Sequence, residues 1–120
     1  MPDPKSLHVL GDRVLKAGAA DRALDLLAHH EAMVTPNLDL CILCADCHKA
    51  LDQPKSELIA LEQAFKADQK RWQTLIRIIW CANRCERAQV IRWALSRLQA
   101  DFPERHAAFF SNHDWLRFFA

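Results

Sequence analysis

Residues 38–51, LDLCILCADCHKAL, carry the side chains of this chain most suited to chemistry. Three of the five cysteines and one of the six histidines lie there. Cys44, Cys47 and His48 form the string C-x-x-C-H, which is typical of c-type haem attachment. Cys41, Cys44 and His48 are spaced i, i+3 and i+7, so they would share one helix face, and thiolates and imidazole suit zinc. Three interpretations follow: a haem site, a metal site, or a helix that packs through small apolar side chains.

The start of the chain argues against haem. Attachment of this kind follows export, and the opening Met-Pro-Asp-Pro-Lys has no apolar segment of the sort that a signal peptide needs. No uncharged apolar run is long enough to span a bilayer. We therefore expect a cytoplasmic protein with no membrane segment and with reduced thiols.

A metal site has less support than simple packing. Structural zinc usually takes its ligands from turns, whereas this spacing lies within a helix, although Cys81 and Cys85 could approach from a neighbouring segment. Free cysteine behaves as a small buried hydrophobe. We expect no metal and no cofactor. A metal- or thiol-dependent regulator built on the cysteines and His48 is kept as an alternative.

Nothing in the chain resembles a catalytic motif. It contains no nucleophile elbow, P-loop, H-E-x-x-H or dinucleotide-binding string. His29, His30, His106 and His113 have no carboxylate or nucleophile at a meaningful spacing. We therefore expect a protein that is not an enzyme.

The composition predicts an all-α fold. Only two glycines and no tyrosine occur, while alanine and leucine, which favour helices, are abundant. Apolar spacing and capping residues predict helices over residues 7–16, capped by Ser6, and 38–51, capped by Asn37, and further helices over 69–84, 87–100 and 103–110. They also predict a second helix capped by Asp21, a fourth capped by Ser56, and a last turn ending at Phe119. Asp68 and Pro103 are expected to begin the fifth and seventh helices. Short loops between such helices predict antiparallel hairpins.

The hairpins look alike in sequence. Leu7, Leu10, Gly11 and Val14 align with Leu40, Leu43, Cys44 and Cys47, and with Ile78, Cys81, Ala82 and Cys85, at spacings of 33 and then 38. In the second helices Ala23 and Leu27 align with Ala60 and Ala64, and with Ala94 and Leu98, at spacings of 37 and 34. The small residues at matching places would let paired helices approach closely.

This pattern resembles the tetratricopeptide repeat (TPR) family. Leu10-Gly11, Val14, Gly18, Ala23, Leu27 and Pro36 stand near the family's characteristic positions. The resemblance implies a TPR-like α-solenoid of about three stacked units over residues 1–103, with residues 104–120 as a capping or docking helix of the same domain. Four extra residues are expected in the second unit near residues 52–55. A generic helical bundle or another α-solenoid is the alternative.

The resemblance also implies a function. Solenoids bind partners on a concave surface, lined here by the first helix of each hairpin. We therefore expect an adaptor or chaperone-like module that binds a peptide segment or partner protein. The residues expected to face outward and bind the partner are His8, Asp12, Lys16, Cys41, Ala45, His48, Lys49, Ile79, Asn83 and Arg87.

Two other surfaces suggest different partners. Residues 70–97 carry seven Lys and Arg but only one acidic residue, which would suit RNA or another polyanion. We instead expect Trp72, Trp80 and Trp93 to fill the core and nucleic acid not to bind. The aromatic C-terminus, residues 109–119, either folds back over the sixth helix or docks on a second subunit or on a further domain.

Overall fold

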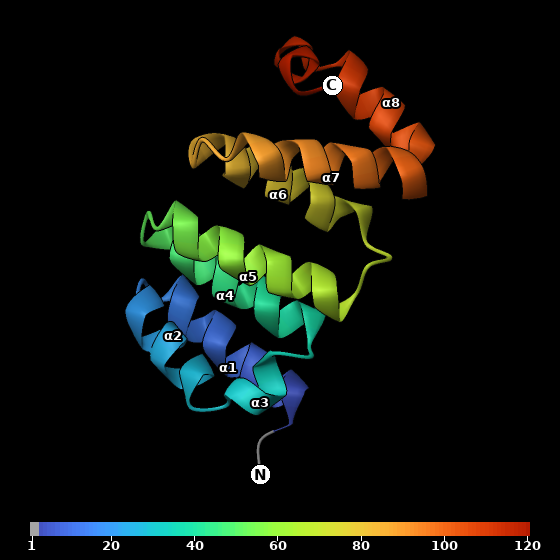
Figure 1. Ribbon diagram of the computed structural model, residues 1–120. Helices are drawn as coiled ribbons and strands as arrows, with labels where there is room; N and C mark the ends of the chain where they lie inside the picture. The colour runs from blue at the N-terminus through green and yellow to red at the C-terminus, as the bar shows by residue number, and fades with distance from the viewer. Residues whose placement is uncertain (1–2) are drawn as a thin grey trace. The chain divides into compact units, whose positions relative to one another are not determined.

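The computed structural model in Figure 1 describes residues 3–120. These residues form eight α-helices and one 3-10 helix and contain no strand, which confirms the all-α class for this part of the chain. Within the same residues, every helix is too short or too polar to cross a membrane. The elements are α1 (Pro4–Lys16), α2 (Ala20–Ala28), α3 (Glu31–Val34), α4 (Leu38–Ala50), α5 (Pro54–Ala67), α6 (Trp72–Arg84), α7 (Ala88–Asp101), α8 (Pro103–Ser111) and the 3-10 helix η1 (Asp114–Phe119).

Several helices begin where their capping residues require. Asn37 caps α4 as predicted, because its side chain accepts a hydrogen bond of 3.0 Å from the backbone N–H of Leu40. Proline is the first residue of α5 and of α8, a position whose N–H has no partner within the helix, so its absence costs nothing. The predicted start at Pro103 is confirmed. Asp3 caps α1 by accepting from the N–H of Ser6 at 2.7 Å, and this bond lowers the pKa of its carboxyl.

Four predicted caps are wrong. Ser6 donates its backbone N–H to a cap and is not one itself, and Asp21 lies in the first turn of α2 rather than ahead of it. Ser56 lies inside α5, because Pro54 opens that helix ahead of it. Asp68 ends α5 and does not begin α6. The short helix α3 was also not predicted.

The chain divides into two compact units, and each is described by itself. The first ends at Gln69 and the second begins at Lys70. In the first unit, α1 pairs with α2 and α4 with α5, and α4 also packs against α1, α2 and α3 (Figure 1). In the second unit, α6 pairs with α7, and α7 contacts both α8 and η1.

The helix boundaries recur at one constant interval. Helices α1, α4 and α6 begin at Pro4, Leu38 and Trp72, so successive starts are numbered 34 apart. Their partners α2, α5 and α7 begin at Ala20, Pro54 and Ala88, again 34 apart. We call this alignment of the three hairpins the repeat register. The hairpins have the same length up to the second helix, and the four extra residues expected in the second unit are absent.

The turns between paired helices recur in the same way. Gly18, Asp52 and Glu86 all have positive φ, at 84°, 53° and 57°. The N–H of the next residue then bonds a carbonyl five positions back, at 3.2, 2.9 and 2.9 Å in the three turns. This is the Schellman arrangement that ends a helix with one left-handed residue. One turn conformation thus closes all three first helices.

The repeat register corrects the predicted alignment. Gly11 corresponds to Ala45 and Ile79, not to Cys44 and Ala82, because the two intervals between first helices are equal. All three of these residues are buried. At Gly11 the reason is visible in the packing: a Cβ there would lie 2.8 Å from Cδ2 of Leu43 on α4. The position is internal in every hairpin.

Candidate binding site between α4 and α5

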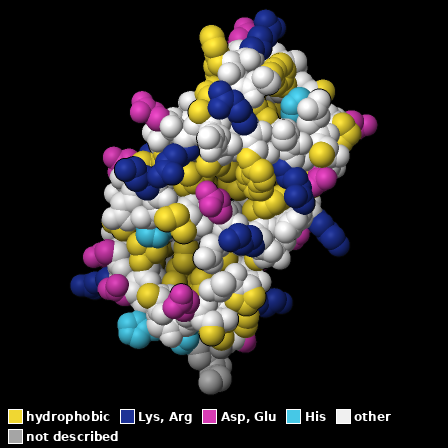
Figure 2. Space-filling model, viewed as in Figure 1, with side chains coloured by type: hydrophobic (Ala, Val, Ile, Leu, Met, Phe, Trp, Pro, Cys, Tyr) yellow, Lys and Arg dark blue, Asp and Glu magenta, His cyan; other side chains and the backbone are white. Residues whose placement is uncertain are grey.

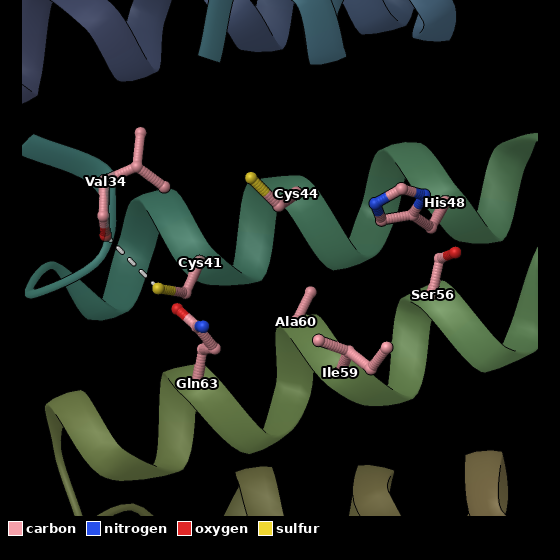
Figure 3. Close-up of a pocket in the computed structure, with 8 residues that line it drawn as sticks. All are labelled: Val34, Cys41, Cys44, His48, Ser56, Ile59, Ala60 and Gln63. Carbon is pink, nitrogen blue, oxygen red and sulfur yellow. Dashed lines mark hydrogen bonds between the residues drawn. The ribbon is translucent and has the colours of Figure 1, made fainter. Parts of the chain in front are cut away.

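A hollow of about 280 Å³ lies between α4 and α5 in the first unit. Its wall is mostly apolar, and polar groups stand at its edge. It is lined by Val34, Cys41, Cys44, His48, Ser56, Ile59, Ala60 and Gln63 (Figure 3). Ile59 is 62% exposed, which is unusual for a large aliphatic side chain. An apolar side chain from another molecule would be removed from water here.

Helix α4 supplies the three groups predicted to share a face. Cys41, Cys44 and His48 do line the same hollow, one on each successive turn. Figure 3 shows them spread along α4 and not converging on one point. Among the described residues, no three His, Cys, Asp or Glu side chains are grouped in a way that could hold a metal ion.

The Cys41 thiol is hydrogen-bonded to the backbone. Its Sγ donates to the carbonyl oxygen of Val34 at 3.2 Å, and the carbonyl of Thr35 lies 3.6 Å away. The Val34 carbonyl, at the end of α3, also accepts the backbone N–H of Asn37 at 3.0 Å, so the thiol adds a second hydrogen bond to it. Burial raises the pKa of Cys41, so the thiol keeps its proton. Cys41 therefore joins α3 to α4.

The other two cysteines of α4 are also neutral thiols. Burial raises the pKa of Cys44 to about 12, and the neighbouring Cys41 and Cys47 add to the rise. Burial, followed by the carboxylates of Asp46 and Asp12, raises the pKa of Cys47 to about 11. Reactive and metal-binding cysteines need the opposite shift, because the thiolate is the nucleophile and the ligand. Cys44 contributes apolar surface to the hollow.

Polar groups mark the edge of the hollow. The His48 ring is half-buried, and its Nδ1 lies 2.9 Å from the Gln53 side-chain oxygen, which fixes its orientation. Ser56 and Gln63 project from α5 on the opposite side (Figure 3). Ordinary binding sites have this composition, an apolar floor with a few oriented polar groups.

The ten predicted binding residues divide into three groups. Cys41 and His48 line the hollow. Lys16, Lys49, Asn83 and Arg87 are exposed, and Asp12, which is partly exposed, pairs with Lys16 at 2.8 Å, while His8 is half-buried on α1. Ala45 and Ile79 are buried, both 0% exposed, and Cys41, although it lines the hollow, is only 2% exposed. The prediction that these three face outward is wrong, because the repeat register places them at internal positions.

Sequence reasoning missed the α5 side of the hollow. It placed binding on the first helices alone, and Ser56, Ile59, Ala60 and Gln63 belong to a second helix. A signal for Ile59 was present. The buried residues Leu58, Leu61 and Phe65 are spaced i, i+3 and i+7, and Ile59 lies off that stripe. An apolar residue off the buried face of a helix is exposed.

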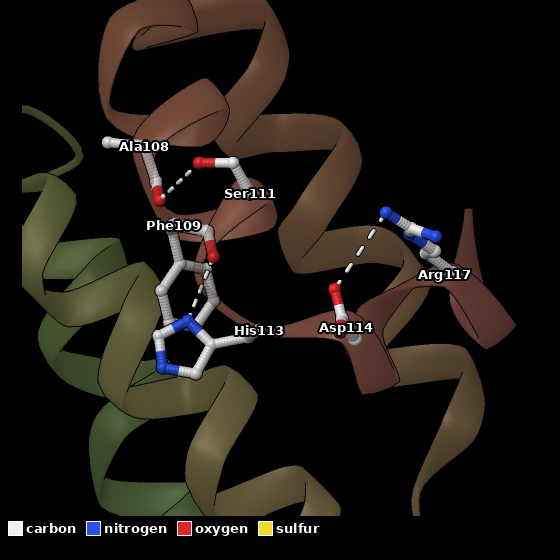
Figure 4. Close-up of polar contacts among 6 residues, drawn as sticks. All are labelled: Ala108, Phe109, Ser111, His113, Asp114 and Arg117. Atoms are coloured by element: carbon white, nitrogen blue, oxygen red, sulfur yellow. Dashed lines mark hydrogen bonds and ion pairs between the residues drawn. The ribbon is translucent and has the colours of Figure 1, made fainter.

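The aromatic C-terminus folds back onto its own unit. Trp80 on α6 makes edge or tilted contacts with Phe109, His113 and Trp115, at centroid distances of 6.1, 5.1 and 5.4 Å. Nδ1 of His113 lies 2.8 Å from the Phe109 carbonyl, and Asp114 and Arg117 form an ion pair of 3.8 Å (Figure 4). Contacts of η1 with α7 show that this segment folds back over that helix, which is one of the two alternatives that the sequence left open.

The tryptophans and arginines of the second unit form a mixed surface. Trp80 and Trp93 are 41% and 43% exposed, so the prediction that they fill the core is wrong. Arg105 lies over the Trp72 ring at 4.4 Å, and Arg97 pairs with Asp101 at 2.6 Å. On the face drawn in Figure 2, basic and acidic side chains are interspersed.

No family model matches the chain, and no curated protein matches it.

Proposed function

We propose that this chain is a protein-protein interaction module, an adaptor or chaperone-like protein of the TPR type, and not an enzyme. The observation that carries the proposal is the hollow between α4 and α5, with exposed Ile59 at its edge. Its occupant is an apolar side chain on an extended or helical segment of a partner protein.

The repeat supports the choice of class. The helix starts and the left-handed turn residues recur at one interval, and that interval matches the TPR unit length of about 34 residues. Gly11 lies where the first helices α1 and α4 approach closely, because a Cβ there would lie 2.8 Å from Cδ2 of Leu43. Proteins built from such units act through preformed surfaces rather than through a catalytic centre.

The size of the hollow limits the group that can bind in it. About 280 Å³ is just below the range of sites for drug-sized ligands, so one side chain fits and a whole cofactor does not. Burying one leucine-sized group contributes about 1.5–3 kcal/mol. That corresponds to an affinity weaker than about 1 mM. The partner must therefore make further contacts beside the hollow, and Lys49, which is exposed and directly follows His48 in α4, is a candidate.

The thiol-dependent alternative is less well supported. A regulator would need a thiolate, and burial holds Cys44 and Cys47 protonated at neutral pH. The polyanion alternative is weakened because arginines of residues 70–97 already engage other groups: Arg92 lies over the Phe119 ring at 5.9 Å, and Arg97 pairs with Asp101.

Selection of short peptides from a displayed library tests the proposal. Enriched peptides should share one large apolar anchor, and their amide shift changes in the protein should centre on Cys44, His48 and Ile59. Ile59→Asp should weaken binding about tenfold or more, because it places a charge beside the anchor. Val9→Asp on α1 is the matched control, since Val9 is also an exposed aliphatic residue of the first unit. Peptides that bind Ile59→Asp as well as the parent would refute the assignment.

A further inference from the structure

The outward face of α1 carries two exposed aliphatic side chains between two cations. Val9 and Leu10 are 49% and 50% exposed. With Lys5, Ser6 and Arg13 they line a shallow depression of about 350 Å³. Helical spacing predicts that Leu10 belongs to the buried stripe with Leu7, but only Leu7 is buried, at 1% exposed. The face is separate from the hollow between α4 and α5.

The corresponding face of α4 is a packing surface. In the repeat register Val9 corresponds to Leu43 and Arg13 to Cys47. Leu43 and Cys47 are 2% and 0% exposed, and they lie in the core cluster with Leu7, Ala23 and Leu27 of the preceding hairpin. This face of a first helix therefore has the shape to receive helices, and no described residue occupies it on α1.

The charges on α1 restrict which helix fits. Lys5 and Arg13 are two turns apart, so they stand about 12 Å apart along the axis, one on each side of Val9 and Leu10. At the corresponding places α4 has Asp39 and Cys47. A partner must thus offer an apolar centre with an acidic group toward each end.

The same charges disfavour a second copy of the chain in symmetric contact. In a two-fold pairing of α1 with α1, the helices run either antiparallel, so that Lys5 of each copy faces Arg13 of the other, or parallel, so that each cation faces its own counterpart. Like charges brought together at an interface suppress that pairing.

We propose that the α1 face formed by Lys5, Val9, Leu10 and Arg13 docks an amphipathic helix of a partner protein whose apolar stripe is flanked by acidic residues about two turns apart. Val9 and Leu10 bury the stripe, and Lys5 and Arg13 pair with the flanking carboxylates. This surface acts independently of the hollow.

A displayed library of amphipathic helices of about four turns, with Glu, Gln or Lys at the flanking positions, supplies the probe. Selected helices should carry Glu at both flanks and bind at least about tenfold tighter than the same helices with Lys there. The variant Lys5→Glu/Arg13→Glu should reverse that preference. Val9→Asp should abolish binding of both forms, while Ile59→Asp should leave it unchanged. All substituted side chains are exposed or half-exposed, so circular dichroism should match that of the parent.

Three outcomes would overturn the proposal. The first is no enrichment of acidic flanks, and the second is a preference for them that survives Lys5→Glu/Arg13→Glu. The third is self-association in analytical ultracentrifugation that Val9→Asp removes, because a second copy would then be the occupant. Failure of these helices to bind would leave the peptide result at Ile59 standing, so the two surfaces are tested separately.

Discussion

Replacing Gly11 with alanine tests the close contact between α1 and α4. The added Cβ would lie 2.8 Å from Cδ2 of Leu43, well inside van der Waals distance, and 3.9 Å from Cδ2 of Leu27. Leu43 is 2% exposed, so its side chain has little room to move away. The contact joins the first hairpin to the second.

Two opposing terms set how much Gly11→Ala changes the free energy of unfolding. Alanine in a helix is favoured over glycine by about 1 kcal/mol. Overpacking a filled core costs about 1–3 kcal/mol. The difference between these terms leads us to expect that Gly11→Ala lowers the free energy of unfolding by about 1 kcal/mol. In a Leu43→Ala background the conflicting atom is gone, and the same substitution should raise it by about 1 kcal/mol.

Chemical denaturation followed by far-ultraviolet circular dichroism measures this change of sign. Tryptophan fluorescence should be recorded beside it, because all four tryptophans lie in the second unit and the first is reported only by the dichroism. Leu43→Val replaces Leu43→Ala if the latter does not fold. A Gly11→Ala substitution that stabilises the parent and the Leu43 variant equally would refute the packing argument.

Four further outcomes are expected. In chemical denaturation, Glu86→Gly should raise the free energy of unfolding by about 1 kcal/mol, and Gly18→Ala should lower it by a similar amount. The reason is that only glycine adopts positive φ without strain. Iodoacetamide labelling of Cys44, followed by mass spectrometry, should accelerate about tenfold per pH unit up to about pH 11 without a plateau. The same raised pKa predicts that stability falls above about pH 9, where the unfolded thiol ionises and the native one does not. Leu116→Ala should cost about 2–5 kcal/mol and speed hydrogen exchange across η1, whereas Phe118→Ala, at an 83% exposed site, should change stability by less than about 0.5 kcal/mol.

Helix positions were largely predictable because their signals are local. Asn37 before an apolar run and Pro103 at a helix start act through the residue's own hydrogen bonds or fixed φ, and both predictions are confirmed. Competing caps were harder to rank. Asp3 and Ser6 both suit the start of α1, and the choice depends on where the extended chain turns into the helix.

The repeat register was not predictable by matching residue types. Cys44 and Ala82 resemble Gly11 in size, whereas the residue that corresponds to it in the third hairpin is Ile79. The turns that fix the register also give little signal, because Asp52 and Glu86 adopt the left-handed conformation usually taken by glycine. The error moved Ala45 and Ile79 onto the predicted surface. The candidate hollow was half predicted, since Cys41 and His48 were proposed but their α5 neighbours were not.

The uniform length of the hairpins has a genetic consequence. A deletion or duplication that spans one whole repeat interval leaves every remaining hairpin with an intact turn and an unchanged repeat register. The chain can therefore lose or gain a hairpin in one step. Removal of residues 38–71 would join Asn37 directly to Trp72. Helix α6, whose present N-cap Arg71 makes no side-chain capping bond, would then inherit the asparagine that caps α4.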